Sequence, residues 1–517
     1  MQLFYAFLPR GIFLYGDIAK RVFLCYTLFN EVKEGEIMPM TTLKVIPMPK
    51  KVLGEDNEGR FASVSVEAAI CTDHAAFSVH IDTLVTYTAV VHGVTLTRGA
   101  GGIRLCCDAA LDAGEYRVVC AENGVTAYAA DDDGAAYAMA TLLQLMAVES
   151  DRLVFPKTEI CDRPDCGYRS LMVDLARQWH PFPTLFAYVD LCYLYKIKYL
   201  HLHFVDTQSY TLPSDIFPKI ATEGRAYTKE QIREINAYAH ARGVELIPEF
   251  EVPGHARAMV EAYPELFAHT PLTEGEKVSR NIVCVGRAGL MENLKKLIEE
   301  IIEMFPYSRY LHLGGDEAEI AAWDRCADCT RYMAERGIPN VHALYSHFTK
   351  EVTDLVLSLG RTPIVWEGFP KEGTEEISRD VVVIAWESYY HLAPDLIEEG
   401  FDIINASWQP LYVTPTVHWS VENILAWNVY NWQHWWPKSE AHLNPIHLQP
   451  TKQVMGGLLC AWEWTYEGEI DIVKENLAAL AERTWNIRRY AEDGEFREKL
   501  NAVLPMADKM CEGRAAT

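Results

Sequence analysis

Two adjacent carboxylates, Asp316 and Glu317, end a short apolar strand pattern that begins at Tyr310. Neighbouring strand residues point to opposite faces, so the two acids could share one site only where the strand ends and the backbone bends. Gly314 and Gly315 permit that bend and leave room for a ligand. The pair therefore indicates general acid–base chemistry, with a helix N-terminus that carries acids to suit its dipole as the alternative interpretation.

Repeated apolar strands predict the fold that must position this pair. After Arg163, strand-like segments alternate with amphipathic helical patterns such as Lys229–Arg242 and Ala288–Met304. Eight strands are expected, at residues 168–174, 197–206, 244–252, 309–317, 362–367, 381–387, 401–408 and 456–464. This spacing is typical of βα units around a buried parallel sheet, and eight units imply an α/β fold of the (β/α)8 TIM-barrel type. Active sites of that fold lie at the carboxyl ends of the strands.

Four regions are expected along the chain. Short alternating strands and one helix, at about Asp133–Val148, indicate a small α+β N-terminal domain at residues 40–160. The catalytic barrel is expected at residues 161–485 and a C-terminal helical tail at residues 486–517. Residues 1–39 are interpreted as a leader of unknown role.

The leader is apolar but does not match a targeting segment. Charged residues interrupt its apolar stretch, so it lacks the continuous core of a membrane span or of a signal peptide. The 13 cysteines are odd in number and show no disulfide spacing, which favours thiols in a reducing compartment. A cytoplasmic location is therefore expected, with secretion left open.

Net charge excludes some classes of partner. The chain has 47 basic and 72 acidic residues, a net charge of −25, which repels nucleic acid and anionic membranes. No partner of either kind is expected, and the oligomeric state is left open. The close pair Cys326 and Cys329 lacks a second pair for zinc, so we interpret it as incidental rather than as a metal or redox site.

The predicted strand ends are rich in acids and tryptophans. The early strands end at acidic and histidine side chains and the later ones at tryptophans: Asp174, His201, His203, Asp206, Glu249, Glu251, His255, Trp366, Trp386, Trp408 and Trp462. Indole faces pack against the C–H surface of a sugar ring while carboxylates bind its hydroxyls. Any single tryptophan is better explained by core packing, but the set indicates a pocket for a neutral sugar and hence glycoside chemistry.

Several separate segments of the chain resemble the β-N-acetylhexosaminidases of glycoside hydrolase family 20. Those segments are Gly134–Leu145, Tyr168–Arg177, Tyr195–Gln208, Ile247–His255 and His312–Glu317. Their order along the chain also matches, and the resemblance extends from about Met40 to the last strand. It implies an exo-acting, retaining enzyme that releases terminal β-linked GlcNAc or GalNAc from a glycan or oligosaccharide, with no cofactor and no metal.

The resemblance also implies that the substrate supplies its own nucleophile. Hydrolysis of a glycosidic bond usually needs two carboxyl groups across the sugar ring, which adjacent residues seldom span. In this family the 2-acetamido oxygen attacks C1 and forms an oxazolinium-like intermediate, a recognised exception. Glu317 would protonate the leaving oxygen and then deprotonate water, while Asp316 would stay ionised and orient the acetamide N–H.

The predicted substrate pocket combines residue chemistry with the resemblance. Arg169 is expected to bind ring hydroxyls because its guanidinium donors are rigid and always charged, with a strand-end ion pair as the alternative. By resemblance, Tyr412 binds the acetamide oxygen and Glu463 the outer hydroxyls. Tryptophans wall the pocket, namely Trp366, Trp386, Trp462 and, as a weaker candidate, Trp427. Three further side chains are expected to support the carboxylates: Asp206, Glu251 and His255.

The chain departs from the family pattern at several positions around the expected pocket. These are Gln178, where His or Asn is usual, Glu251, where Asp is usual, Thr414, where a supporting acid often lies, and Glu463, which is displaced by one position. The departures leave the proposed reaction intact but leave the preference between GlcNAc and GalNAc open.

Two other functions stay open at the level of sequence. A metal-dependent amidohydrolase on the same barrel is suggested by a set of possible ligands: His201, His203, His255, His312 and Asp316. A catalytically silent sugar-binding homologue would keep the pocket without turnover, although the intact pair Asp316 and Glu317 argues against it. Activity that a chelator abolishes and zinc restores would favour the first alternative. Failure to hydrolyse an aryl β-N-acetylglucosaminide would favour the second.

Overall fold

The computed structural model describes the chain from residue 43 onward with a few short gaps. The described residues are 43–54, 61–67, 69–122, 124–275, 277–488, 490 and 493–512. The predicted leader at residues 1–39 lies outside them. Within the described part of the chain, no helix combines the length and the apolar composition that crossing a bilayer requires.

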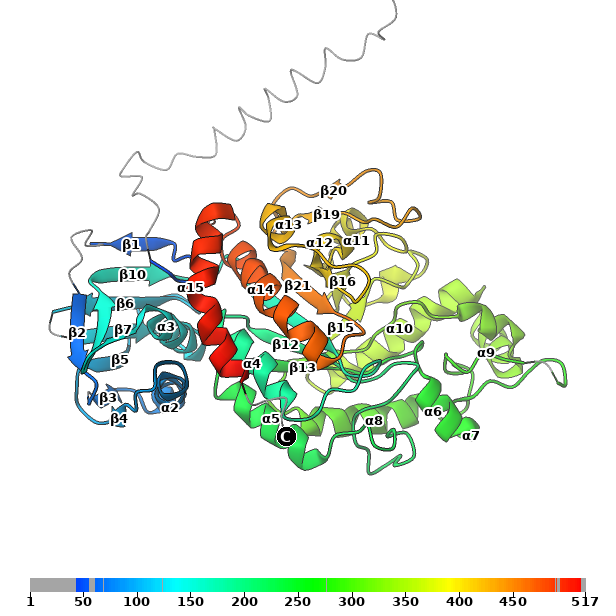
Figure 1. Ribbon diagram of the computed structural model, residues 1–517. Helices are drawn as coiled ribbons and strands as arrows, with labels where there is room; N and C mark the ends of the chain where they lie inside the picture. The colour runs from blue at the N-terminus through cyan, green and yellow to red at the C-terminus, as the bar shows by residue number, and fades with distance from the viewer. Residues whose placement is uncertain are drawn as a thin grey trace, which may run out of the picture. The chain divides into compact units, whose positions relative to one another are not determined.

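The first described part is built on two sheets. Among the described residues, one sheet has seven strands in the order β1-β10-β6-β7-β5-β3-β4 and the other has the order β2-β9-β8 (Figure 1). The strands are β1 (Lys51–Leu53), β2 (Phe61–Ser65), β3 (Ala69–Thr72), β4 (Thr97–Arg98), β5 (Ile103–Cys107), β6 (Tyr116–Ala121), β7 (Gly124–Ala129), β8 (Ala147–Glu149), β9 (Arg152–Pro156) and β10 (Thr158–Asp162). The helices are η1 (Ala75–Phe77), α2 (Ser78–Tyr87), η2 (Thr88–His92) and α3 (Asp132–Leu145). The predicted α+β class is confirmed.

Helix α3 begins where the sequence supplies a cap. The Asp131 side chain accepts a hydrogen bond from the backbone N–H of Gly134, and acidic residues in the first turn suit the helix dipole. The helix ends at Leu145, before the predicted end at Val148, because residues 147–149 pair with β9 as strand β8 instead.

Eight parallel strands of the described chain form a closed barrel, as predicted. They pair in chain order and β21 pairs back with β11, while the short strand β18 (Tyr412–Val413) lies against β21. The barrel strands are β11 (Tyr168–Asp174), β12 (Tyr199–His203), β13 (Glu245–Glu249), β14 (Tyr310–His312), β15 (Thr362–Trp366), β16 (Val382–Ala385), β17 (Asp402–Asn405) and β21 (Val454–Ala461).

Helices follow most of the barrel strands. They are α4 (Thr184–Leu194), α5 (Lys229–His240), α6 (Arg257–Ala262), α7 (Pro264–Phe267), α8 (Leu290–Met304), η3 (Ile320–Arg325), α9 (Ala327–Arg336), α10 (Val341–Ser358), η4 (Thr374–Glu376), α11 (Ala393–Glu398), α12 (Trp408–Leu411), α13 (Val421–Ala426) and α14 (Tyr466–Trp485). A small hairpin, β19 (Asn431–Trp432) and β20 (Ile446–His447), precedes β21. The C-terminal helix α15 (Asp493–Cys511) packs against α4 and α14 (Figure 1). The predicted domain boundaries at 160/161 and 485/486 fall close to the ends of β10 and α14, and we keep them as proposals.

Strand β14 is shorter than the predicted strand and ends at His312. Gly314 and Gly315 have φ angles of 68° and 97°, a left-handed conformation that a strand cannot continue through. The chain therefore turns at the point where the two carboxylates follow.

Candidate active site

Asp316 and Glu317 follow β14 at the carboxyl end of the barrel, where the sequence predicts them. Their side chains differ in exposure, at 12% for Asp316 and 56% for Glu317. Glu317 has a φ angle of 48°, which a side-chain-bearing residue seldom adopts. This backbone turn separates two neighbouring acids into one that faces the interior and one that faces solvent.

Glu251 lies beneath this turn. A β-carbon at Gly314 would sit 1.7 Å from Glu251 Oε2, so both the φ angle and the close contact require glycine there. Glu251 is fully buried, and its carboxylate has no hydrogen-bond partner among the described residues. Burial, together with the charges of Asp316 and Glu249, raises the pKa of Glu251 well above its usual value. Burial thus favours the neutral, protonated form of Glu251 beneath the turn, and its supporting role stays a prediction.

Asp316 is poised to titrate close to neutrality. Burial raises the pKa of Asp316 to about 6; His255 opposes the rise, and the charges of Glu317 and Glu249 add to it. Asp316 is therefore mostly ionised at pH 7 and becomes protonated below about pH 6.

His255 joins the two acids to a buried aspartate. Its Nδ1 lies 3.0 Å from Asp206 Oδ1, and its Nε2 lies 3.9 Å from Asp316 Oδ2 and 3.8 Å from Glu317 Oε2. Burial opposes a charge on His255, but Asp206 and Asp316 outweigh it and raise the pKa of His255 to about 9. A charged imidazolium thus lies between the carboxylates, and the supporting role of His255 stays a prediction.

Asp206 is held ionised by cationic neighbours. His203 Nε2 lies 2.9 Å and Arg177 Nη2 2.8 Å from Asp206 Oδ2, in addition to the contact with His255. Burial alone would raise the pKa of Asp206, but these partners hold it well below its usual range. Asp206 thus lies within the network that reaches the two acids, and its supporting role stays a prediction.

A second network lies deeper in the barrel around Glu249. Its carboxylate lies 2.6 Å from His203 Nδ1 and 2.9 Å from His312 Nδ1, and it accepts a hydrogen bond of 2.6 Å from Trp366 Nε1. His201 Nε2 is also 3.0 Å away. Burial raises the pKa of Glu249, but the histidines lower it well below its usual value, and the pKa of His203 rises to about 10. His201, Glu249 and His312 are close enough to hold a metal ion.

Aromatic rings bring four predicted pocket residues together. Trp366 lies 6.1 Å from Trp386 and 6.1 Å from Trp462, measured between ring centroids. Tyr412 stacks on Trp386, with ring centroids 6.0 Å apart and an interplanar angle of 13°. Trp408 also stacks on Tyr412, with ring centroids 4.7 Å apart. The set forms one continuous, largely buried aromatic cluster at the carboxyl ends of the later strands. Trp408 extends the predicted wall.

Trp427 does not belong to this wall, so that prediction is wrong. Its indole packs where Gly457 of β21 leaves space, next to Leu480 and Thr484 of α14. Its Nε1 donates to the carbonyl of Asn431 at 3.1 Å. Because Gly457 lacks a side chain, the loop before β21 places the indole between the strand and its covering helix.

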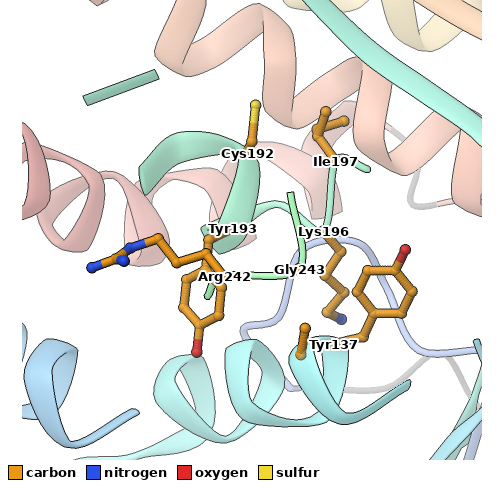
Figure 2. A pocket seen from close by; sticks show the side chains of 8 residues that line it. Tyr137, Cys192, Tyr193, Lys196, Ile197, Arg242 and Gly243 are labelled. Carbon is orange, nitrogen blue, oxygen red and sulfur yellow. The ribbon is translucent and has the colours of Figure 1, made fainter. Parts of the chain in front are cut away.

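The prediction that Arg169 binds ring hydroxyls is also wrong. It is the second residue of β11, so its guanidinium lies at the amino end of the barrel, where it donates to the carbonyls of Lys196 and Cys166 and to the hydroxyl of Tyr137 at 2.6 to 3.1 Å. Tyr137 and Lys196 line a small pocket between α3 and the segment before β12 (Figure 2). Arg169 is therefore a structural anchor and cannot bind sugar hydroxyls beside Glu317.

Arg177 supplies the cation that Arg169 does not. It follows the end of β11, and its guanidinium lies 4.7 Å from the ring centroid of Trp462. It lies 2.8 Å from Asp206, 3.5 Å from Asp174 and 3.9 Å from Glu463. Its place three residues beyond a strand end was the signal that could have identified it. Glu463 itself has a 59% exposed side chain, which suits a contact with outer hydroxyls.

Two further acids at strand ends were missed, Glu367 and Glu387. The carboxylate of Glu367 accepts backbone N–H bonds from Ser388 at 3.0 Å and Tyr389 at 2.7 Å, which fixes the loop after Trp386. Burial raises the pKa of Glu387 to about 8, and the charges of Glu367, Glu317 and Asp316 act in the same direction. Glu387 is thus a third carboxyl group whose charge interacts with those of Asp316 and Glu317. Each of these acids directly follows a strand-end tryptophan, a pattern visible in the sequence.

Comparisons with known proteins point to one family. The family model "Glycosyl hydrolase family 20, catalytic domain" matches residues 167–488, and "Glycosyl hydrolase family 20, domain 2" matches residues 42–163. A beta-hexosaminidase from Vibrio furnissii is 28% identical over 419 residues, which cover 75% of this chain and 67% of the relative. A beta-hexosaminidase from Porphyromonas gingivalis is 31% identical over 288 residues, which cover 51% of this chain and 36% of the relative. Matched segments thus span from about a third to two thirds of these relatives.

Solved structures share the fold at low sequence identity. An inactive mutant of the GH20 exo beta-N-acetylglucosaminidase from Vibrio harveyi superposes with a TM-score of 0.78 at 23% identity, over 92% of this chain and 79% of that one. A mutant Streptomyces plicatus beta-hexosaminidase in complex with GlcNAc gives a TM-score of 0.71 at 22% identity, over 92% of this chain and 97% of that one.

Proposed function

This chain belongs to glycosyl hydrolase family 20, and from this premise we propose that it is an exo-acting β-N-acetylhexosaminidase. The proposed reaction releases terminal β-linked GlcNAc or GalNAc from a glycan or oligosaccharide with retention of configuration. The observation that carries the proposal is the pair of neighbouring acids, Asp316 inside and Glu317 outside, at the same end of the barrel as the aromatic cluster of Trp366, Trp386 and Trp462.

In the proposed first step, the 2-acetamido oxygen of the substrate bonds to C1 while the bond from C1 to the leaving oxygen breaks. Glu317 gives its proton to that oxygen. In the second step, water bonds to C1, Glu317 takes the proton from water, and the oxazolinium ring opens to restore the acetamide. Two inversions at C1 produce net retention. The exposed side chain of Glu317 suits a group that must exchange protons in each half of the cycle.

Asp316 has the complementary task in this proposal. The acetamide nitrogen becomes positive as the oxazolinium ring forms, and a carboxylate held in a largely buried position stabilises that charge strongly. His255 fixes the position of Asp316 relative to Glu317, because its imidazolium lies within 4 Å of both. Asp206 in turn keeps His255 charged and oriented, although the charge of Arg177 acts in the opposite direction.

The sugar ring is proposed to bind against the outer members of the aromatic cluster, Trp386 and Trp462, which keep some exposed surface. The guanidinium of Arg177 lies over one face of the Trp462 indole. A sugar ring that packs beside Trp462 would therefore contact both the indole and the guanidinium donors. Arg177 and Glu463 are the proposed contacts for the outer hydroxyls, and the Tyr412 hydroxyl is the proposed donor to the acetamide oxygen. The family's usual acid near Tyr412 is replaced by Thr414, whose hydroxyl binds the Val417 carbonyl at 2.8 Å, so the choice between GlcNAc and GalNAc rests on the other residues.

A panel of aryl β-glycosides with and without the 2-acetamido group tests the proposal. We expect hydrolysis only when the acetamide is present, because only then does the substrate carry the nucleophile. An oxazoline-mimicking thiazoline should inhibit far more strongly than free GlcNAc. Equal rates on glucosides and N-acetylglucosaminides would contradict substrate assistance, and no hydrolysis of either would favour a sugar-binding protein.

The expectations about partners and location stay proposals. The net charge of −25 supports the absence of nucleic acid and anionic membrane among the partners. None of the 12 cysteines in the described part of the chain is paired in a disulfide, which supports a reducing, cytoplasmic location.

A further inference from the structure

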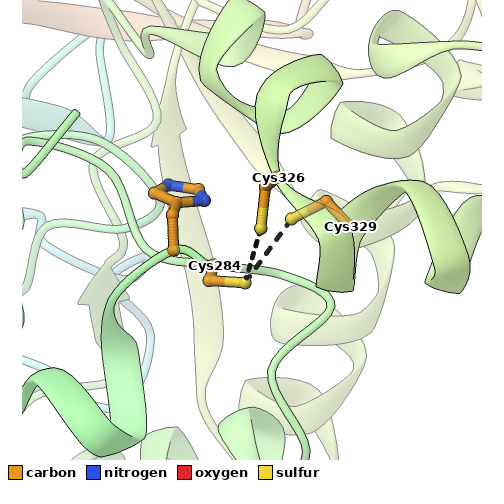
Figure 3. A group of neighbouring side chains, drawn as sticks. Cys284, Cys326 and Cys329 are labelled. Atoms are coloured by element: carbon orange, nitrogen blue, oxygen red, sulfur yellow. Dashed lines mark hydrogen bonds between the residues drawn. The ribbon is translucent and has the colours of Figure 1, made fainter. Parts of the chain in front are cut away.

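Three cysteines and a histidine from distant parts of the chain meet beside the start of α9 (Figure 3). Cys284 lies in the loop between α7 and α8, Cys326 caps α9, and Cys329 lies in its first turn. The fourth member is His269, which follows α7. All three cysteines have no exposed surface, and His269 is 5% exposed. One ligand atom from each of the four residues lies within 4.8 Å of every other.

The spacing of the sulfur atoms fits a tetrahedral metal ion. Cys284 Sγ lies 3.4 Å from Cys326 Sγ and 3.6 Å from Cys329 Sγ. Zinc with sulfur bonds of about 2.3 Å in tetrahedral geometry holds its sulfurs about 3.8 Å apart. Three thiols at mutual contact cannot all be satisfied by one disulfide, whereas a single zinc ion binds all three as thiolates.

His269 is oriented as a metal ligand. Its Nε2 donates a hydrogen bond to the carbonyl of Ile282 at 3.1 Å, which leaves the lone pair on Nδ1. That Nδ1 is buried and has no hydrogen-bond partner among the described residues. Zinc-binding histidines commonly use one ring nitrogen for the metal and donate the other to a carbonyl, which fixes the tautomer. A buried, unpaired nitrogen beside three thiols is otherwise hard to explain.

The surroundings favour negative charge at the cysteines. Cys326 and Cys329 stand at the N-terminus of α9, where the helix dipole stabilises thiolates. Their spacing, with two residues between them, lets both sulfurs reach one ion. Gly286, two residues after Cys284, must be a glycine, because a β-carbon there would lie 2.2 Å from the Asp328 backbone. The close approach of these two loops brings Cys284 to the cysteine pair.

We propose that His269, Cys284, Cys326 and Cys329 form a structural zinc site. All four ligands come from the protein, which leaves no open position for a substrate and distinguishes the site from a catalytic one. Sequence spacing could not reveal it, since Cys284 precedes Cys326 by 42 residues and His269 lies still earlier. The interpretation of Cys326 and Cys329 as incidental is therefore replaced.

The site joins the two loops that frame the catalytic acids. On one side, Val283 donates its N–H to the carbonyl of Pro253 at 3.0 Å, next to the segment that carries His255. On the other side, Trp323 Nε1 donates to the Val283 carbonyl at 3.0 Å. Asn281 Nδ2 donates to Oε1 of Glu319, two residues after Glu317, at 3.0 Å. Zinc bound here would restrain the loop of Glu317 against the loop of His255.

Metal analysis of the purified full-length chain tests the proposal. Protein freed of loosely bound ions by gel filtration should contain about one zinc ion per chain. Cys329→Ala should lose most of that zinc, whereas Cys192→Ala should retain it, because Cys192 is an equally buried cysteine in α4 outside the cluster. Folded wild-type protein that holds no zinc, and takes up none when Zn²⁺ is added, would overturn the site.

A second measurement keeps the test decisive if Cys329→Ala does not fold. Wild-type protein unfolded in the presence of a chromogenic zinc indicator should release about one equivalent of zinc, and Co²⁺ loaded in its place should show the sulfur-to-cobalt charge-transfer bands of a thiolate site. A mass that indicates a disulfide within the cluster would contradict the proposal. So would a chelator that abolishes activity without lowering the melting temperature, since that result requires a catalytic metal.

Discussion

The two ends of the barrel use charged residues in opposite ways. At the amino end, the guanidinium of Arg169 is fully engaged with the Lys196 and Cys166 carbonyls and the Tyr137 hydroxyl. At the carboxyl end, Asp316 and Glu317 stand side by side with like charge and share only the imidazolium of His255 at nearly 4 Å. The first arrangement stabilises the fold, and the second leaves charge available to a ligand.

Unpaired polar atoms and left-handed backbone gather near the candidate catalytic acids, although the amino end also has left-handed Lys196 and the unpaired Tyr168 hydroxyl. Within the described residues, several polar atoms near the site have no hydrogen-bond partner: both carboxylate oxygens of Glu251, Asp316 Oδ1, His255 Nε2 and Trp462 Nε1. Left-handed φ angles occur at His255, Glu317 and Glu463. Such features cost stability and persist where a function requires them. The carboxyl end is therefore where substitutions should alter chemistry more than folding.

Replacing Glu317 by Gln should produce the largest kinetic effect. Loss of the proton donor should lower kcat by about 100- to 10,000-fold on substrates whose leaving group needs protonation. Substrates with a very acidic phenol should lose far less, because that leaving group departs without a proton. Steady-state kinetics on a series of aryl β-N-acetylglucosaminides measures the difference.

Two controls belong to the same experiment. The melting temperature of Glu317→Gln should stay close to that of the wild type, since the side chain is largely exposed, and its zinc content should be unchanged. An equal loss on all leaving groups would show that Glu317 is not the proton donor.

Arg169→Met should produce the contrasting result at the other end of the barrel. Removing a buried cation leaves the Lys196 and Cys166 carbonyls and the Tyr137 hydroxyl without partners, which should lower the free energy of unfolding by about 3 kcal/mol. The folded fraction should hydrolyse substrate with an unchanged KM. Urea denaturation and kinetics at low temperature separate the two effects. A raised KM without a loss of stability would return Arg169 to the substrate site.

Arg177→Met is the matched variant at the carboxyl end and should have a smaller effect. Loss of charge-assisted bonds to the sugar should lower kcat/KM by about 10- to 100-fold, mainly through KM. Arg177→Lys should recover only part of this, because one ammonium cannot reproduce the planar contact over Trp462. If Arg177→Met lowers stability as much as Arg169→Met and leaves kcat/KM unchanged, the two ends do not differ as proposed.

The sequence predicted the features that depend on the order of residues along a single strand. The eight strands, the position of Asp316 and Glu317 and the cluster of Trp366, Trp386 and Trp462 all follow from residues at the ends of apolar runs. Arg169 was misplaced because resemblance of a whole segment does not say which end of the strand a residue occupies. Arg177 belongs to the same segment, Tyr168–Arg177, but lies beyond the carboxyl end of strand β11.

The sequence did not reveal the features that depend on contacts between residues far apart along the chain. Trp427 lies in a loop before β21, and its indole fills the space beside Gly457, which is 30 residues further along the chain. The partners of Cys326 and Cys329 come from a loop before α8, so no short spacing pattern marks them. Such sites emerge only when the packing of separate loops is known.

The smallest predicted effect is a pH dependence that reports on Asp316. Because burial raises the pKa of Asp316 to about 6, the ionised form should fall tenfold for each pH unit below that value. The value of kcat/KM reflects the free enzyme, so its acid limb should bend near pH 6 and decline at lower pH. Asp316→Asn should be less active and should lack this bend, since no group remains there to titrate. An acid limb that persists unchanged in Asp316→Asn would assign the titration to another group and would remove the link between burial of Asp316 and the charge it offers to the acetamide.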